Sequence, residues 1–188
     1  MYKLKIITST NREGSKGIIV ANWLYDQVRG DTRFETELLD LAVIGLPFMS
    51  EPNHPRLQQY QFDHTKKWSA TIENSDAFII VLSEYNFGFP APIKNALDYL
   101  FNEWKYKAVG IVSYGGVSGG LRSTQMLKQV LTTLSMTPLM ESVPIPFFSK
   151  YITDDEQFQP EETVVKSVRA MLTEIHRWTE ALTPLRRK

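Results

Sequence analysis

The chain has 188 residues, of which 43% are hydrophobic, and this composition predicts one globular domain over residues 1–188. Basic and acidic residues each total 21, so the net charge is zero and favours neither a nucleic-acid partner nor an anionic membrane surface. The absence of cysteine excludes disulfides, thiolate nucleophiles and iron–sulfur clusters, and the three scattered histidines predict no metal site.

Five strand-like runs follow one another along the chain. The third and fourth are apolar throughout, which is typical of parallel strands buried on both faces. The predicted strands are Leu4 to Thr8, Phe34 to Leu39, Ala77 to Leu82, Ala108 to Ser113 and a short Leu139–Met140 region. The longest apolar run is too short to cross a membrane and no leader is evident after Met1, so we expect a cytoplasmic protein with no membrane contact.

Apolar residues at helical spacing fill the intervals between these strands. The stripes begin at Ile18, Ile93, Leu127 and Val164, and a weaker helix covers Thr65 to Glu73. This alternation predicts an α/β fold, a doubly wound five-stranded parallel sheet with helices on both faces. The proline-rich segment Pro47 to Phe62 is predicted to be a loop over the functional site, with a plain spacer as the alternative.

The loop after the first predicted strand is suited to a phosphate. It contains Ser9, Thr10, Arg12 and Ser15 just before a helix, whose first N–H groups are free to bind an anion. It matches neither the Walker loop nor the three-glycine dinucleotide motif. The alternative is that Ser15 only caps the helix and Arg12 is solvated.

The loops after the third and fourth predicted strands are suited to a planar heterocycle. The first contains Glu84, Tyr85, Asn86 and Phe87, which combine flat apolar surface with polar groups. The second contains Ser113, Tyr114, Gly115 and Gly116, which offer main-chain N–H groups. The alternative for the first loop is an ordinary turn with a solvated Glu84. We expect Arg122 at the surface or in an interface.

A phosphate site and a planar-ring site at the same sheet edge predict FMN rather than a bare nucleotide. The segments that carry these sites resemble the NADPH-dependent FMN reductase family of flavodoxin-like proteins. The matching segments are Ser9 to Ser15, Ser83-Glu84-Tyr85-Asn86 followed by Ile93-Lys94-Asn95-Ala96-Leu97-Asp98, and Ser113-Tyr114-Gly115-Gly116. Some positions depart from the family pattern: Thr8 stands for a glycine, Asn11 is inserted, Ser83 stands for a proline, and Pro92 and Ile93 vary the start of the helix.

The resemblance implies a flavodoxin-like fold and an oxidoreductase in which bound FMN accepts a hydride from NADPH or NADH. The electrons then pass to a small-molecule acceptor, a flavin, a quinone or an azo compound. Because the cofactor supplies the chemistry, no catalytic side chain is expected. The alternatives are a non-catalytic flavin-binding redox sensor and a flavodoxin-type electron carrier, whose usual acidic surface the neutral charge does not favour.

The helix that begins at Ile93 also suggests an oligomer. Tyr99 is predicted to lie opposite the apolar stripe of that helix, with Phe101 and Tyr106 nearby, so apolar surface surrounds it. This pattern predicts a homodimer or a dimer of dimers with the flavin close to the subunit boundary.

Overall fold

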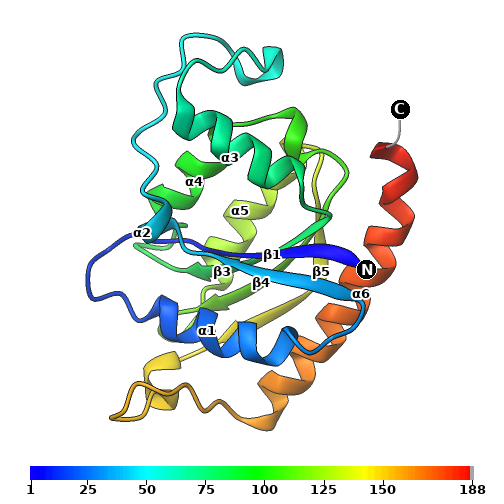
Figure 1. Ribbon diagram of the computed structural model, residues 1–188. Coiled ribbons are helices and arrows are strands. Elements are labelled where there is room, and N and C mark those ends of the chain that lie inside the picture. The colour runs from blue at the N-terminus through cyan, green and yellow to red at the C-terminus, as the bar shows by residue number, and fades with distance from the viewer. Residues whose placement is uncertain (187–188) are drawn as a thin grey trace.

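A parallel sheet of five strands forms the centre of the protein. The computed structural model describes residues 1–186 and places the strands in the order β2-β1-β3-β4-β5 (Figure 1). The strands are β1 (Tyr2–Thr8), β2 (Phe34–Leu39), β3 (Ala77–Ser83), β4 (Ala108–Tyr114) and β5 (Thr137–Ile145). This order confirms the predicted doubly wound, flavodoxin-like sheet, in which the winding reverses between β1 and β3.

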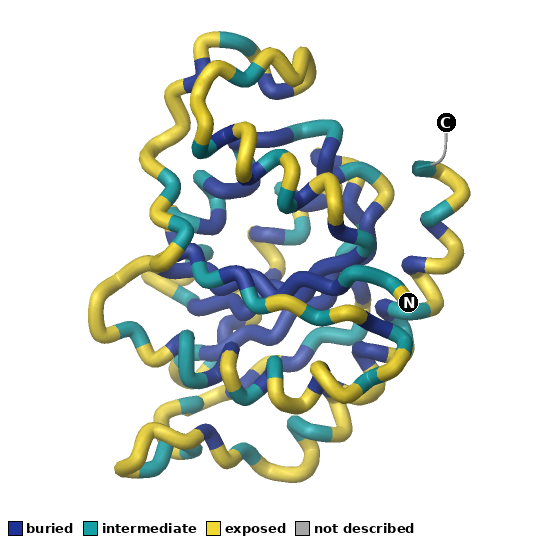
Figure 2. Tube along the Cα trace, viewed as in Figure 1, coloured by how far each residue is buried: buried dark blue, intermediate teal, exposed yellow. Residues whose placement is uncertain are grey.

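Helices cover both faces of the sheet. On one face lie α1 (Gly17–Val28) and α6 (Glu162–Arg186), and on the other lie α3 (Asp63–Glu73), α4 (Ala91–Asp98) and α5 (Leu121–Thr133) (Figure 1). Each face has its own apolar core, and β3 and β4 are buried over their whole length between the two cores (Figure 2). The apolar runs of the sequence therefore mark the central strands, as predicted.

The fifth strand is longer than predicted. The sequence analysis placed it at Leu139–Met140, whereas β5 spans nine residues from Thr137 to Ile145. Two prolines, Pro138 and Pro144, interrupt the apolar pattern within it. Proline is tolerated there because β5 is an edge strand, where one side needs no ladder hydrogen bonds.

The observation on which the predicted oligomer rested is corrected by the structure. The helix ends at Asp98, and a 3₁₀ helix, η2 (Asn102–Trp104), follows it. Tyr99 is fully buried within the chain, and its hydroxyl donates to the Pro47 carbonyl at 2.9 Å. The segment after β2 folds back over this tyrosine, which the helical pattern alone does not reveal.

That segment has two parts. Pro47 and its neighbours pack against α4, whereas the remainder, with the short 3₁₀ helix η1 (Pro55–Leu57), packs over α3 and η2. The buried Glu103 fastens the second part, since its carboxylate accepts from the Tyr60 hydroxyl at 2.8 Å and from Gln58 at 3.2 Å. Only the first part lies at the carboxyl edge of the sheet, so the prediction of a loop over the site stays a prediction and applies to that part alone.

A short helix between β2 and this segment, α2 (Leu41–Ile44), was not predicted. Asp40 caps it by accepting from the Ala42 N–H at 3.0 Å, and Gly45 ends it in the left-handed conformation. Thr8 at the end of β1 donates to the same Asp40 carboxylate. The helix therefore lies beside the loop that follows β1.

Within residues 1–186, no helix combines the length and the apolar character that a membrane crossing requires. No group of three or more histidine, aspartate or glutamate side chains in the same range is placed to hold a metal ion.

Candidate functional site

Hydroxyl groups join the loops that follow β1 and β3. The Ser9 hydroxyl accepts from the backbone N–H of Ser83 at 3.0 Å, and Thr10 Oγ1 lies 3.0 Å from the Tyr85 hydroxyl oxygen. The Arg12 Nε donates to the same tyrosine oxygen at 3.3 Å. Because β1 and β3 are neighbours in the sheet, two of the three predicted loops meet at its carboxyl edge.

The environment of Tyr85 lowers the pKa of its hydroxyl. Burial alone raises the pKa, but hydrogen bonds with Thr10 and Arg12 and the positive charge of Arg12 outweigh burial and bring it below the ordinary value of 10.0. The hydroxyl oxygen therefore lies among hydrogen-bonding groups and beside a positive charge. It is held between the two loops, where an anionic or carbonyl ligand would meet it.

A tight turn follows Glu84. The Tyr85 N–H donates to the Gly88 carbonyl and the Gly88 N–H donates to the Tyr85 carbonyl, each at 2.9 Å. Asn86 and Phe87 between them have φ values of +50° and +70°, which define a type I′ turn. Phenylalanine in this left-handed region costs about 1–2 kcal/mol. Phe87 is also 65% exposed, so burial of its ring does little to offset that cost. Such strain is typical of functional sites.

Glu84 fastens this turn to the beginning of α5. Its carboxylate accepts from the Ser118 hydroxyl at 2.8 Å, from the Arg122 backbone N–H at 3.1 Å and from the Arg122 guanidinium at 2.8 Å. Burial raises the pKa of Glu84, but these hydrogen bonds outweigh it and lower the pKa below the ordinary value of 4.5. Glu84 is therefore ionised at neutral pH, and as a half-buried residue whose side chain is 9% exposed it is not solvated freely.

Two predictions are affected by this arrangement. Glu84, predicted to contact a cofactor, lines the cavity described below, and its carboxylate also holds Ser118 and Arg122, so it positions the turn, while cofactor contact stays a prediction. Arg122 is exposed, as the prediction of a surface residue expected, but it also pairs with Glu84, and its guanidinium lies 4.1 Å from the ring centroid of Phe87. Neither link can be recognised from residue spacing along the chain.

Two predicted residues shape the loop after β4, Ser113 from within the end of the strand and Gly116 from the loop itself. The fully buried Ser113 hydroxyl donates to the Gly119 carbonyl at 2.8 Å. The Gly116 carbonyl accepts from the Gly119 N–H at 3.1 Å. Ser113 and Gly116 therefore maintain the loop, while Tyr114 and Gly115 between them face the neighbouring loops.

A cavity of about 160 Å³ lies where the loops after β1, β3 and β4 meet. Six of its nine lining residues are predicted site residues. The lining consists of Arg12, Ser15, Lys16, Ser83, Glu84, Tyr85, Tyr114, Gly115 and Phe148. The predicted Ser9 and Thr10 lie behind this lining and hold Ser83 and Tyr85, whereas Asn86 and Phe87 are exposed on the turn.

The two ends of this cavity differ in chemistry. Arg12, Lys16 and the Ser15 hydroxyl stand before α1, which is the arrangement that binds a phosphate. At the other end the rings of Tyr114 and Phe148 are 4.7 Å apart between centroids. The alternative role of Ser15 is met in part, because its hydroxyl accepts from the Gly17 N–H at 3.3 Å.

Gly17 permits the close approach of α1 to the loop after β4. A Cβ atom at this position would lie 2.1 Å from the Tyr114 hydroxyl oxygen, far inside any contact distance. Burial raises the pKa of Tyr114, so this hydroxyl stays protonated at neutral pH. A glycine at the first position of α1 is therefore a requirement of the site.

The sequence analysis did not name Lys16 or Phe148 as site residues, and it placed Ser83 in the segment that resembles the family without giving it a cofactor contact. Phe148 belongs to the 3₁₀ helix η3 (Phe148–Tyr151), which follows the strand whose extent was misjudged. A longer fifth strand would have placed its carboxyl end near Pro146 and drawn attention to the two phenylalanines after it.

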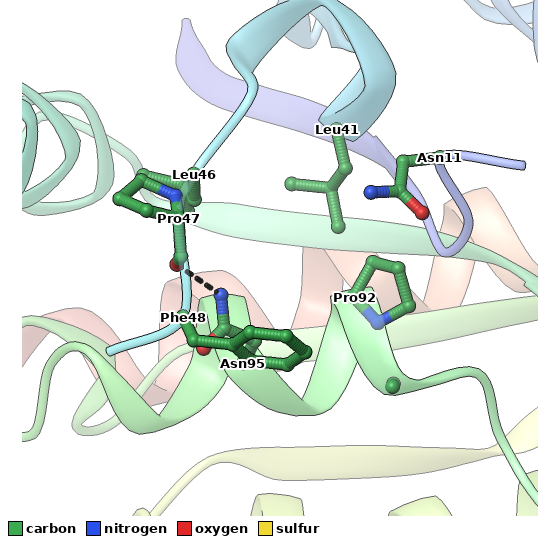
Figure 3. Close-up of a pocket in the computed structure, with 8 residues that line it drawn as sticks. Asn11, Leu41, Leu46, Pro47, Phe48, Pro92 and Asn95 are labelled. Atoms are coloured by element: carbon green, nitrogen blue, oxygen red, sulfur yellow. Dashed lines mark hydrogen bonds between the residues drawn. The ribbon is translucent and has the colours of Figure 1, made fainter. Parts of the chain in front are cut away.

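A second cavity of about 310 Å³ opens on the other side of the loop after β1 (Figure 3). Asn11 lines it from that loop, Leu41 from α2, and the first turn of α4 lines it from below. Its lining residues are Asn11, Leu41, Leu46, Pro47, Phe48, Ala91, Pro92 and Asn95. None of these residues was among the predicted site residues.

Comparisons with known proteins agree with this geometry. The family model described as NADPH-dependent FMN reductase matches residues 2–150. An NAD(P)H-dependent FMN reductase of Schizosaccharomyces pombe is 36% identical over 148 residues, which cover 77% of this chain and 74% of that protein. One of Nectria sp is 33% identical over 153 residues, covering 78% and 76%.

Solved structures show the same fold. FerB, a flavoenzyme NAD(P)H:(acceptor) oxidoreductase from Paracoccus denitrificans, is similar with a TM-score of 0.78 at 23% identity, and the match covers 96% of this chain and 98% of that one.

Proposed function

Because the chain belongs to the NADPH-dependent FMN reductase family, we propose that it binds FMN noncovalently and transfers electrons from NADPH or NADH to a small-molecule acceptor. It is thus an oxidoreductase. The observation that carries the proposal is the cavity at the carboxyl edge, with cationic and hydroxyl groups at one end and aromatic rings at the other.

The residues at this edge fit the phosphate and the polar chain of FMN, and because the cavity of about 160 Å³ is smaller than the whole cofactor, the ring would extend from it over the exposed turn after β3. Arg12, Lys16 and Ser15 supply the charges and hydrogen bonds that a phosphate dianion needs, supported by Ser9 and Thr10 behind them. Tyr85, Tyr114 and the main chain at Gly115 would hold the ribityl chain and the edge of the ring. When bound, FMN supplies the two-electron chemistry, accepting a hydride and releasing electrons to the acceptor.

The protein's own part is to bind and to orient. Glu84 and Arg122 keep the turn after β3 in one conformation, so a ring bound against it has a fixed position. Hydride transfer requires donor and acceptor atoms about 3–3.5 Å apart, and a fixed ring position meets that requirement. The proposed acceptor is a small molecule, a free flavin, a quinone or an azo compound.

The proposed oligomer is a homodimer or a dimer of dimers. Tyr99 no longer supports it, but other exposed apolar side chains do, because Phe87, Leu121 and Met126 lie on the turn after β3 and on α5. Such a patch at the edge of a site is typical of an interface. A monomeric mass by light scattering at micromolar concentration with FMN bound would contradict this proposal.

The function is tested by loading the purified protein with FMN and measuring NADPH and NADH oxidation with menadione, free FMN or an azo dye as acceptor. We expect a yellow protein whose flavin is bleached by NAD(P)H without oxygen and whose turnover a metal chelator does not change. A protein that shows no flavin spectrum after titration with FMN contradicts the cofactor assignment. Bound flavin without NAD(P)H oxidation would support the sensor or electron-carrier alternative.

A further inference from the structure

The ammonium group of Lys16 faces two different anions. Lys16 directly precedes α1 and lines the phosphate end of the proposed FMN cavity, which it forms with Arg12 and Ser15. Its Nζ also forms an ion pair with the carboxylate of Glu156, which follows it by 140 positions in the chain. The two side chains are 48% and 64% exposed. Lys16 therefore lies between a carboxylate of the protein and the position of a bound phosphate.

The other cation of the phosphate end has no such partner. Within residues 1–186, no carboxylate lies within ion-pair distance of Arg12. Glu84 also lines the cavity, but its carboxylate pairs with Arg122. Among the described residues, Glu156 is therefore the one carboxylate that pairs with a cation of the phosphate end.

The segment 152–158 closes on itself and presents Glu156 at its turn. The Thr153 N–H donates to the Gln157 carbonyl at 2.9 Å, and the Glu156 N–H donates to the Thr153 carbonyl at 3.0 Å. Glu156 has a φ of +59°, in the left-handed region that residues with a Cβ atom rarely adopt. The hydrogen bonds of the turn hold it there, so its side chain leaves the segment in a fixed direction.

An aromatic contact attaches this segment to α1. Phe158 is 5% exposed, and its ring lies 5.2 Å from that of Trp23 between centroids. Figure 1 shows the segment beside the beginning of α1, where Lys16 is placed. Because both elements are held, the pair of Lys16 and Glu156 costs less conformational entropy than one between two flexible loops.

The pairing reduces what Lys16 can offer to a phosphate. An ammonium group carries one positive charge, and a carboxylate in contact with it neutralises part of the charge that a second anion would meet. A phosphate at this end must draw Lys16 away from Glu156 and loses the free energy of that pair. For a pair this exposed the loss is modest. A flavin without a phosphate meets no such competition.

We propose that Glu156 is a specificity-determining residue for the cofactor. Its carboxylate competes with the phosphate of FMN for the Lys16 ammonium and so limits the preference of the protein for FMN over riboflavin. The inference rests on the proposed function. On binding, Lys16 exchanges Glu156 for the phosphate, whereas Arg12 gives up no carboxylate. FMN is consequently held less tightly than the two cations together would allow.

Two other roles for Glu156 make different predictions. A carboxylate that only positioned Lys16 would favour FMN binding, so its removal would weaken FMN. A plain surface ion pair would affect neither flavin. The sign of the change in FMN affinity therefore separates the three roles.

The test measures the Kd of the purified protein for FMN and for riboflavin by fluorescence titration in a buffer without phosphate. Glu156→Gln removes the charge and keeps the size of the side chain. The matched control is Asp154→Asn, which removes one negative charge from the same exposed segment without touching the Lys16 pair. Lys16→Ala and the double variant Lys16→Ala/Glu156→Gln show whether the effect passes through the lysine.

We expect Glu156→Gln to lower the Kd for FMN about twofold to fivefold at about 0.01 M salt and to leave the Kd for riboflavin unchanged. The gain should nearly vanish at about 1 M salt, where charges are screened within about 3 Å. Asp154→Asn should change neither Kd by a comparable factor. In the Lys16→Ala background, Glu156→Gln should bring no further gain.

Four results would overturn the inference while FMN binding by the natural protein leaves the proposed function standing. They are an FMN affinity that is unchanged or lowered in Glu156→Gln, an equal gain in Asp154→Asn, an equal gain for riboflavin, and a gain that persists in the Lys16→Ala background. A natural protein that binds no FMN at all would overturn the cofactor assignment and the role of Glu156 together.

Discussion

The turn after β3 and the loop after β1 lie side by side at one sheet edge, yet the charged side chains of the two regions have different surroundings. The carboxylate of Glu84 is buried and accepts three hydrogen bonds from α5 and the residues before it. The guanidinium of Arg12 is exposed and contacts only the Tyr85 hydroxyl and the Glu13 carbonyl among the described residues. One charge holds the protein together, and the other remains available to a ligand. Substitutions in the two regions should therefore change different measured quantities.

The largest effect on stability is expected from Glu84→Ala. Removal of the carboxylate leaves the Ser118 hydroxyl and the Arg122 guanidinium without their acceptor, and the free energy of unfolding should fall by about 2–3 kcal/mol. Urea unfolding measures the change. As the control, Glu162→Ala removes the exposed partner of Lys166 and should change the value by less than about 0.5 kcal/mol. A Glu84→Ala effect no larger than the control would contradict the structural role of Glu84.

Arg12→Ala should change ligand affinity and leave stability unaltered. We expect FMN binding to weaken by about 1.5–3 kcal/mol, the range for a hydrogen bond to a charged group, while riboflavin binding, which involves no phosphate, stays nearly the same. Fluorescence titration of both flavins measures the difference. The control is Arg29→Ala, at an exposed arginine just after α1. Equal losses for FMN and riboflavin would show that Arg12 does not face the phosphate.

A smaller effect of Glu84 is expected in the pH dependence of the free energy of unfolding. Its folded-state pKa lies below the unfolded value of about 4.5, so its contribution to stability is complete above pH 4.5 and is lost as pH falls through the folded pKa. The difference in the free energy of unfolding between the natural protein and Glu84→Gln should therefore narrow as pH falls. A difference that stays constant from pH 7 to pH 3 would argue against an ionised Glu84.

The smallest effect, and one of opposite sign, is expected from Phe87→Gly. Glycine removes the left-handed strain of about 1–2 kcal/mol but also the contact between the phenylalanine ring and Arg122, which is worth about 0.5–1 kcal/mol at an exposed site. The free energy of unfolding should therefore rise by about 0.5 kcal/mol. Asn86→Gly should raise it less, since asparagine tolerates this conformation. A loss of stability in Phe87→Gly would show that the ring contact outweighs the strain.

The succession of strands and helices that forms the sheet could be predicted because each element produces its own local pattern of apolar residues. The apolar runs at Ala77 and Ala108 and the helical stripes between them correspond to β3, β4 and their helices. The extent of β5 could not be predicted in this way, because Pro138 and Pro144 interrupt its strand pattern. These prolines are tolerated because β5 lies at the edge of the sheet, which the local pattern does not indicate.

The site was predicted where neighbouring residues share one task, as in the loops containing Arg12 and Tyr85. It was missed where the task depends on a partner distant in the chain. Glu84 and Arg122 meet only because α5 packs beside the end of β3, and Tyr99 is buried only because the segment after β2 folds back over it. Such contacts arise from the tertiary fold and leave no local pattern in the sequence.

Asn95 and Tyr99 hold residues 46–49 in a way that determines which substitutions this segment can accept. Both side chains form hydrogen bonds with main-chain atoms, the carbonyl of Pro47 and the N–H of Met49. None of these bonds involves the side chain of Phe48, which lies between the two residues. The backbone there keeps its path whichever residue occupies position 48. Residue 48 can therefore be exchanged without loss of the hydrogen bonds that fix the main chain on both sides of it.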